Sequence, residues 1–202
     1  MHITDTALSR IKEEFGYCGS WAIWADEAGR PKSGMGDLSV FDFDRNTINR
    51  GSIHARFVIV GLNISGKIRE SFANFHEESG HFHDYKMRNA FRGTPLWGAY
   101  MTDILKDFPE VDSRKVRMAI KHDPRLLKSH FDSFRREIEI LGHENPVLIS
   151  LGGEATRIVN EFAGNSYRVI GVMHYSHRIS SEKYSAHILD RLKQEGFGQA
   201  AP

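Results

Sequence analysis

The sequence has few of the residues that build covalently cross-linked or membrane-spanning structures. Cysteine occurs once in 202 residues, as Cys18, which excludes an internal disulfide and a cysteine-ligated iron–sulfur cluster. No apolar run reaches the roughly 18 residues that a membrane-spanning helix needs. The first ten residues are polar and mixed in charge, unlike a secretory signal. We therefore expect a cytoplasmic protein with no membrane partner.

An excess of charge of one sign is also missing. The chain has 27 Lys and Arg against 26 Asp and Glu, a net charge of +1, which excludes a histone-like polycation but permits a local basic face. Hydrophobic residues at 40% and charged residues at 26% are ordinary for a globular protein. The length suits one domain with a substantial core, so we expect a single domain over residues 1–202.

Short, continuous apolar runs recur along the chain, a pattern typical of strands buried on both faces. The predicted strands are Phe57–Val60, Ala99–Thr102, Val147–Ile149 and Val169–Met173, with a further short strand near Trp21 and Ile23.

Capped helical patterns lie before, between and after these runs. Predicted helices cover Leu8–Phe15 after a Thr4 or Asp5 cap, the segment from Asp123 and Pro124 to Gly142, Ala155–Phe162, and a last helix that starts at Ser180 or Ser181. Residues 25–55 are expected to be mostly loop, with room for one short helix. Strands that alternate with helices predict an α/β fold, here a three-layer α/β/α domain with a short, mainly four-stranded parallel sheet.

Polar residues follow each predicted strand, at the point where ligands bind in open α/β sheets. The first strand leads into Gly61–Lys67, the second into Asp103, the third into Gly152–Glu154 and the fourth into His174–Arg178. Because the carboxyl ends of parallel strands meet at one edge, the sequence predicts that Asn63, Asp103 and His174 share a cleft.

Three of these segments resemble, in order and spacing, motifs of the uracil-DNA glycosylase superfamily. The run GLNISG at 61–66 resembles the Gly-x-Asn-Pro-Gly first motif of the mismatch-specific and thymine-DNA glycosylase branch. The run AYMTDILK at 99–106 resembles the second-strand segment of the iron–sulfur branch, and MHYSHRIS at 173–180 resembles the late His-Pro-Ser motif. The resemblance spans about residues 56–195, which we treat as a glycosylase-like core.

The resemblance implies a fold and a function. It implies a uracil-DNA glycosylase-like fold and a base-excision repair enzyme that flips a base out of DNA and hydrolyses its N-glycosidic bond, with no cofactor or metal. In that reading Asn63 positions the attacking water and His174 stabilises the departing base. Phe82, or alternatively Phe75 or Phe72, is the aromatic platform under the base. The remaining residues implied are Gly61, Leu62 and Asp103 for the base, and Ser65, Gly66, Lys67, Ser176, His177 and Arg178 for DNA.

The chain departs from the family motifs at three positions. Ile64 and Tyr175 replace the motif prolines, and Asp103 stands where the family has a base-reading Asn. An ionised carboxylate only accepts hydrogen bonds, so Asp103 would repel the carbonyl edge of uracil and suit a donor edge, as on cytosine or adenine. These departures leave open a second reading, a catalytically inactive nucleic-acid or nucleobase-binding protein of the same fold.

Three further patterns have alternative interpretations. Gly61–Lys67 also spells G-x-x-x-x-G-K, which is nearly a P-loop of a nucleotide hydrolase, but Ile68 replaces the Mg²⁺-binding Ser or Thr. The group His76, His81, His83 and Asp84 has the composition of a metal site, or of a solvated loop. The basic stretches at 114–121 and 135–136 are either phosphate contacts or solvated helix faces.

Overall fold

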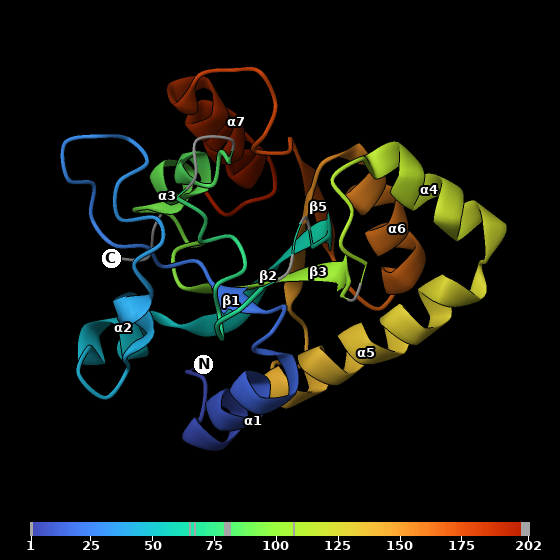
Figure 1. Ribbon diagram of the computed structural model, residues 1–202, viewed down its shortest axis with the longest axis horizontal. Helices are drawn as coiled ribbons and strands as arrows, with labels where there is room; N and C mark the ends of the chain where they lie inside the picture. The colour runs from blue at the N-terminus through green and yellow to red at the C-terminus, as the bar shows by residue number, and fades with distance from the viewer. Residues whose placement is uncertain (1, 65, 67, 79–81, 107, 199–202) are drawn as a thin grey trace.

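The computed structural model describes residues 2–64, 66, 68–78, 82–106 and 108–198, and they form a mixed α/β fold around a five-stranded sheet (Figure 1). The strands are β1 Ser20–Trp21, β2 His54–Asn63, β3 Ala99–Leu105, β4 Val147–Leu151 and β5 Val169–Val172. The helices are α1 Asp5–Phe15, the 3-10 helix η1 Leu38–Phe41, α2 Thr47–Ser52, α3 Tyr85–Phe91, α4 Ser113–His122, α5 Arg125–Leu141, α6 Gly153–Ala163 and α7 Ser181–Gln194. No helix in these ranges has the length and apolar character that crossing a membrane requires.

The strand order is β1-β3-β2-β4-β5, with β1 antiparallel to β3 and every other pair parallel. A parallel strand lies at each of the four predicted segments, but the sheet has five strands and not the four expected, because the short N-terminal strand joins it as an antiparallel edge. After β2 the chain crosses to β3 on one side, whereas β4 and β5 lie on the other side of β2. The sheet thus has its topological switch point at β2 and β4, where open α/β sheets bind ligands.

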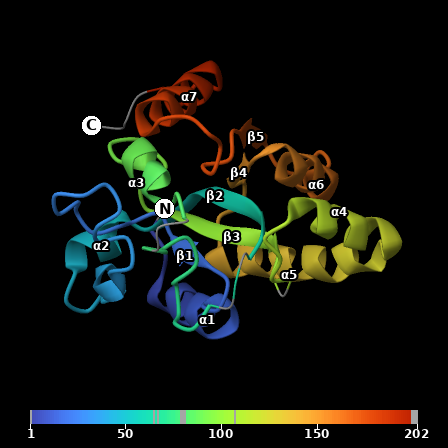
Figure 2. The same ribbon diagram turned by 45° about the horizontal axis from the view of Figure 1, so that its top comes forward.

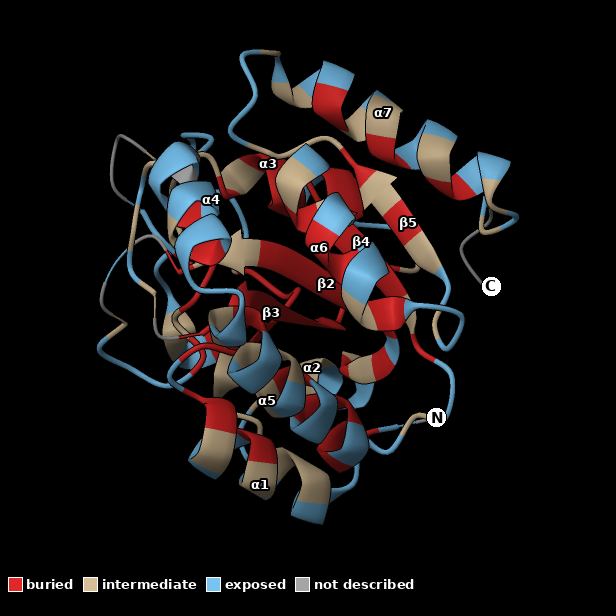
Figure 3. Cartoon of the chain, turned by 90° about the vertical axis from the view of Figure 1, so that its right-hand side faces the viewer, coloured by how far each residue is buried: buried red, intermediate tan, exposed pale blue. Residues whose placement is uncertain are grey.

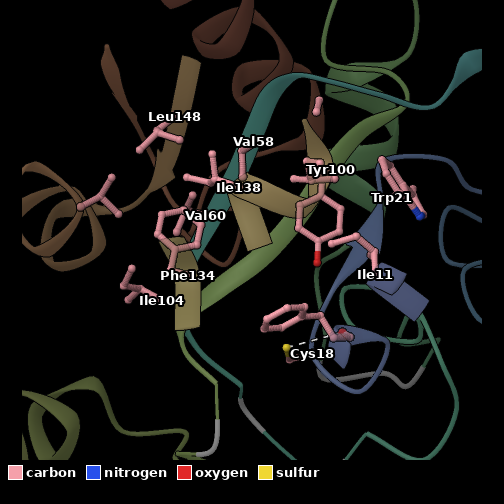
Figure 4. Close-up of a cluster of buried hydrophobic side chains, with 14 of the residues drawn as sticks. Ile11, Cys18, Trp21, Val58, Val60, Tyr100, Ile104, Phe134, Ile138 and Leu148 are labelled. Atoms are coloured by element: carbon pink, nitrogen blue, oxygen red, sulfur yellow. Dashed lines mark hydrogen bonds between the residues drawn. The ribbon is translucent and has the colours of Figure 1, made fainter. Parts of the chain in front are cut away.

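Helices cover both faces of the sheet, as Figure 2 shows with α3 and α7 above it and α1 and α5 below it. The alternation of side chains along β2 explains this arrangement, because Val58 and Val60 enter one core cluster and Phe57 and Ile59 enter the other. The first cluster also holds Phe134 of α5, among other residues of α1, α5 and α6 (Figure 4). Red, buried positions accordingly concentrate on β2 and β3, while exposed positions lie on the outer sides of the helices (Figure 3).

Local sequence signals account for most helix boundaries. Thr4 Oγ1 accepts from the Ala7 N–H at 3.1 Å and starts α1 as predicted, and Ser180 caps α7 through the Lys183 N–H. Gly142 ends α5 in the left-handed conformation, with φ 69°. These boundaries are confirmed because caps and glycine stops act within a few residues.

Three helical features differ from the prediction. Helix α5 begins at Arg125, so Pro124 occupies the cap position and Asp123 is the C-cap of the preceding helix α4. Helix α4 itself was not predicted, because its basic residues were interpreted as a charged stretch, although Val116 and Ile120 share its buried face. Helix α3 was also missed. It buries Lys86 and Arg88, and such polar residues hide the apolar pattern of a helix.

A buried polar network joins α5 to the underside of β3. Glu137 forms an ion pair with Lys106, and its Oε1 accepts hydrogen bonds from Tyr100 at 2.7 Å and Thr102 at 2.8 Å. Lys106 Nζ also donates to the carbonyl oxygen of Asp103 at 2.9 Å. The network fixes the carboxyl end of β3, where Asp103 lies.

Candidate functional site

A cleft of about 470 Å³ opens at the carboxyl ends of the strands, at the topological switch point. Strand β2 contributes its last residues, and the β4–α6 turn and the segment after β5 contribute further lining residues. The lining residues are Leu62, Asn63, Phe82, His83, Glu110, Val111, Leu151, Gly152, Gly153, Glu154, Ala155, His174, Tyr175 and Ser176. The structure therefore brings Asn63 and His174 into one site, together with the predicted Leu62, Phe82 and Ser176.

His174 is held as a neutral hydrogen-bond donor. The Ser176 backbone N–H donates to Nδ1 at 3.2 Å, so Nδ1 is an acceptor and the ring proton resides on Nε2. Ser176 Oγ lies 2.8 Å from the same Nδ1. Burial lowers the pKa of His174 to about 4, which keeps the ring neutral at physiological pH. The side chain consequently offers one N–H, Nε2–H, in a partly buried wall of the cleft.

Gly152 makes room for this histidine. Its φ of 89° suits glycine, and a Cβ on it would lie 3.2 Å from the Cβ of His174. Gly152 also precedes α6, whose first residues line the cleft without a side-chain cap. The positive end of the α6 dipole therefore faces the same space as the Nε2–H of His174.

Asn63 is fixed by its amide nitrogen. The two N–H groups of Nδ2 are shared among the carbonyl oxygens of Ile64 at 2.9 Å, Phe108 at 2.9 Å and Glu110 at 2.7 Å. These acceptors define the amide orientation, and they leave Oδ1 with no hydrogen bond from a described residue. Asn63 thus presents a carbonyl-type oxygen, able to accept a hydrogen bond from a water molecule.

Asp103 does not line this cleft, so the predicted meeting of three side chains holds for only two of them. The Asp103 side chain is buried, and its Oδ2 accepts from Asn74 Nδ2 at 2.8 Å. Gly61 pairs with Asp103 across the β2–β3 register, and Asp103 Oδ1 fills the space that a Cβ on Gly61 would take. Burial raises the pKa of Asp103 to about 6. The physical reason for the difference is that Asp103 precedes the end of β3, inside the sheet edge.

A second cavity of about 450 Å³ adjoins the cleft, and Phe82 and Tyr175 line both. We call it the inner cavity because the buried side chains of Asn74, His76 and Asp84 line it, while exposed Arg69, Glu70 and Glu77 line its open part. Asn74, Phe75, His76 and Asp84 also line it. Phe75 has a φ of 64°, a conformation that is rare outside glycine and often found at functional positions. Of the candidate aromatic platforms, Phe82 lies between the two cavities, Phe75 within the inner cavity and Phe72 in the hydrophobic core.

A basic groove of about 420 Å³ continues from the other side of the cleft. It shares His83 and Ser176 with the cleft and is also lined by Tyr85, Lys86, His177, Arg178, Ile179, Ser180 and Lys183. Arg178 and Lys183 are exposed and have no ion pair within the described chain. By contrast, Arg114 pairs with Asp112, Arg135 with Asp132 and Arg136 with Glu14, so those predicted basic stretches are partly neutralised.

Two alternative interpretations of the sequence find little support in the geometry. Gly61 and Asn63 still belong to β2, and no helix begins among the described residues between Asn63 and Tyr85, whereas a P-loop leads directly into a helix. His76 is buried with Nδ1 2.8 Å from the Asn74 carbonyl and Nε2 2.9 Å from the Ile23 carbonyl. Within the described ranges no group of three His, Cys, Asp or Glu side chains could hold a metal ion.

Three of the predicted positions, Ser65, Lys67 and His81, lie outside the described residues, and Gly66 is exposed beside the inner cavity. Sequence reasoning missed Asn74, Glu110 and the groove residues Tyr85 and Lys183 as parts of the site. Only Asn74 carried a signal, since a polar residue between Phe72 and Phe75 in an apolar stretch suggests a buried hydrogen bond. Comparison with known proteins finds no matching family model and no matching curated protein.

Proposed function

We propose that this chain is a glycosylase-like protein of the uracil-DNA glycosylase type, which binds nucleic acid, takes an extruded base into its cleft and hydrolyses the N-glycosidic bond. The observation that carries the proposal is the meeting of Asn63 and His174 in one cleft at the strand ends. Their segments follow β2 and β5, which are separated in the sheet by β4. The neutral state of His174, with its proton on Nε2, supports the same function.

The chemistry follows from these two side chains. As the glycosidic bond breaks, its electron pair leaves with the base, and Nε2–H of His174 donates a hydrogen bond to the negative charge that develops there. A fixed donor of this kind contributes roughly 3 kcal/mol to the transition state. Water, held by Oδ1 of Asn63, forms the new bond to the sugar carbon. The products are a sugar with a hydroxyl group and a free base that takes up the proton released by the water.

The surroundings of the cleft suit a polyanion. The basic groove leads to the cleft at Ser176, and Arg178 and Lys183 stand at its border as exposed cations. Phosphates bound there would place one nucleotide against His174. Extruding that base costs a few kcal/mol, and stacking on an aromatic side chain such as Phe82 returns about 1–3 kcal/mol.

A base-release assay tests the proposal. Oligonucleotides with uracil, hypoxanthine, xanthine, adenine, cytosine or mismatched bases are incubated with the protein, and abasic sites are cleaved and counted. We expect release from at least one substrate, and a fall of roughly 10²–10³-fold for His174→Ala, the loss typical of a removed charge-stabilising donor. Asn63→Ala should also lower the rate. His122→Ala and Asn165→Ala, at exposed positions, are the matched controls.

One observation favours a second function, base-selective binding without cleavage. The two carboxylates that line the cleft are both engaged, because Glu110 accepts from the Asp112 N–H at 2.9 Å and Glu154 pairs with Arg157 at 2.8 Å. Neither is free to act as a general base. Tight binding of an oligonucleotide without formation of an abasic site would favour this function over hydrolysis.

A further inference from the structure

The inner cavity has the character of a pocket for a flat heterocycle. The aromatic side chains of Phe75, Phe82 and Tyr175 line it, and the rings of Phe75 and Tyr175 meet edge to face with centroids 6.5 Å apart. Aromatic side chains beside fixed polar groups suit a small-molecule site, and exposed Arg69, Glu70 and Glu77 make the open part of this lining polar. Because Phe82 and Tyr175 also line the cleft, a base in this cavity would have its sugar next to Asn63 and His174.

One buried polar group in the lining of this cavity is the side-chain amide of Asn74. Both N–H groups of Nδ2 are used, one donated to the Cys18 carbonyl oxygen at 2.6 Å and one to Asp103 Oδ2 at 2.8 Å. The backbone carbonyl of Cys18 accepts only, so it fixes which end of the amide is nitrogen. Asn74 Oδ1 then has no hydrogen-bond partner in the described chain.

This oxygen is open to the cavity. Asn74 is only 9% exposed and lines the cavity. Its Oδ1 has no hydrogen-bond partner in the described chain, but this atom keeps some solvent-accessible surface. Asp103 cannot reach a ligand from its buried position, but it sets the direction of the amide that can. Asp103 is therefore a positioning residue, and Asn74 is the residue that would touch the base.

Asp84 adds a second acceptor to the same lining. It is 2% exposed, its Oδ2 accepts from the Glu77 N–H at 3.1 Å, and the Tyr175 hydroxyl interacts with its carboxyl group, whereas its buried Oδ1 has no partner at close hydrogen-bond geometry in the described chain. An unpaired buried oxygen is costly, and a ligand N–H would satisfy it. Burial, together with the neighbouring carboxylates of Glu77 and Asp103, raises the pKa of Asp84 to about 7. Burial and the carboxylates of Asp84 and Asp103 also raise the pKa of Tyr175 well above its ordinary value, so its hydroxyl stays protonated beside the pocket.

We propose that the inner cavity is the base pocket and that Asn74, oriented by Asp103, selects bases with an amino group at the edge that enters the cavity, such as adenine or cytosine, with Asp84 as a second acceptor. The inference rests on the proposed function for the role of the cleft. An acceptor edge pairs with an amino group and repels a carbonyl group, so uracil and hypoxanthine, which carry a carbonyl in place of the amino group, are disfavoured.

Free bases test the pocket without requiring DNA binding or cleavage. The Trp24 indole N–H donates to the Phe75 carbonyl oxygen at 3.0 Å, so its NMR resonance reports on the cavity wall. Adenine is compared with hypoxanthine and cytosine with uracil, since each pair differs chiefly in an amino or a carbonyl group. We expect the amino member of each pair to bind about tenfold more tightly, because its N–H group satisfies an acceptor that a carbonyl group leaves unpaired.

Variants then assign the selectivity. Asn74→Ala should abolish the tenfold preference, and Asp103→Asn should narrow it, because it weakens the second of the two hydrogen bonds that hold the Asn74 amide. Asp84→Asn should reduce the preference and leaves the Asn74–Asp103 hydrogen bond in place. This variant tests the inference if the other two variants fail to fold. Asn165→Ala, an exposed position, is the control that keeps the preference.

Several results would overturn the inference. These are equal or tighter binding of uracil and hypoxanthine, no resonance shift with any base, or an unchanged preference in both Asn74→Ala and Asp84→Asn. The proposed function fails separately, when wild-type protein releases no base from any oligonucleotide while free adenine or cytosine still binds. Conversely, the protein could release uracil in preference to other bases, and this release could depend on Asn63 and His174. That result would support the proposed function and reject the assignment of the inner cavity as a pocket for amino-bearing bases.

Discussion

Asn74 Nδ2 donates a 2.8 Å hydrogen bond to Oδ2 of Asp103, which links the segment before α3 to strand β3. The other carboxylate oxygen of Asp103 fills the space where Gly61 has no side chain. Asp103 is therefore held between Asn74 and Gly61, and the glycine makes room for the carboxylate. The chemistry of the pocket depends on both relationships.

Gly61→Ala should destabilise the fold and remove the selectivity of the pocket. An added Cβ would overlap Asp103 Oδ1 and would lie 3.3 Å from Phe75 Cζ, so the carboxylate must move. Overpacking of this kind costs about 1–3 kcal/mol, measured by urea unfolding. Gly51→Ala is the matched control, because nothing lies within 4 Å of its Cβ position and alanine favours the helix α2. Equal stability of the two variants would contradict the close contact.

Asp84→Asn should remove a pH dependence from stability. Burial raises the pKa of Asp84 from 3.8 to about 7, so the folded state holds this proton more tightly than the unfolded state. The proton bound to Asp84 therefore adds to the free energy of unfolding. This addition is fully present below pH 3.8 and is lost as the pH rises through about 7. Between about pH 5 and pH 8 the wild type should lose about 2–3 kcal/mol relative to Asp84→Asn. Chemical unfolding at both pH values measures the difference, and Asp44→Asn, at an exposed position, should track the wild type.

The sheet and most helices could be predicted from sequence because their signals are local. The run Phe57–Val60 is apolar on both faces, which is typical of a central strand, and Gly142 or Ser180 marks a helix end within one turn. Helix α4 escaped prediction because half of the segment from Arg114 to Lys121 is charged, and this stretch was interpreted as a basic surface and not tested for helical periodicity. Helices and strands could be predicted where burial in the core gives their apolar residues a regular spacing.

The sequence predicts that the site lies at the strand ends, but it does not predict which side chains there face the cleft. Parallel strands bring Asn63 and His174 to one edge whatever lies between them, so their meeting followed from topology. Whether a side chain at the edge faces the cleft depends on register and on neighbours in the chain. Asp103 lies inside the edge because Gly61 admits it and Asn74 binds it, and no local pattern reports such a distant pairing.

Breaking the buried ion pair between Lys106 and Glu137 should destabilise the protein strongly. Both side chains are almost fully buried, and Glu137 also accepts from Tyr100 and Thr102. Lys106→Met leaves a buried carboxylate without its cation, at a cost of about 3–5 kcal/mol. Replacing both residues, as Lys106→Met with Glu137→Leu, should recover part of this loss, because no lone charge remains. A double variant less stable than either single variant would show that the pair is not coupled in this way.

His174 should act as a neutral donor throughout the physiological range. Burial lowers its pKa from 6.5 to about 4, so NMR titration of its imidazole should show no inflection near 6.5. The contribution of His174 to base release, taken as the rate ratio of wild type to His174→Gln, should stay constant from about pH 5.5 to pH 8. His122, which is exposed, provides a histidine for comparison in the same spectra. A titration of His174 near 6.5 would contradict its neutral, buried state.

Lys183→Ala and Arg178→Ala should weaken nucleic-acid binding mainly through its salt dependence. Both side chains are exposed cations that line the basic groove, and neither has an acidic partner in the described chain. Removing one cation that binds a phosphate should reduce the slope of log affinity against log salt by about 0.7–0.9, the value for one released counterion. Anisotropy titrations of a labelled oligonucleotide at several salt concentrations measure this slope. Lys12 is exposed on α1 and lines neither the cleft, the inner cavity nor the basic groove, so Lys12→Ala should leave the slope unchanged. An equal reduction for Lys12→Ala would show that binding depends on overall charge alone. The basic groove would then not be the surface that binds a nucleic-acid strand next to His174.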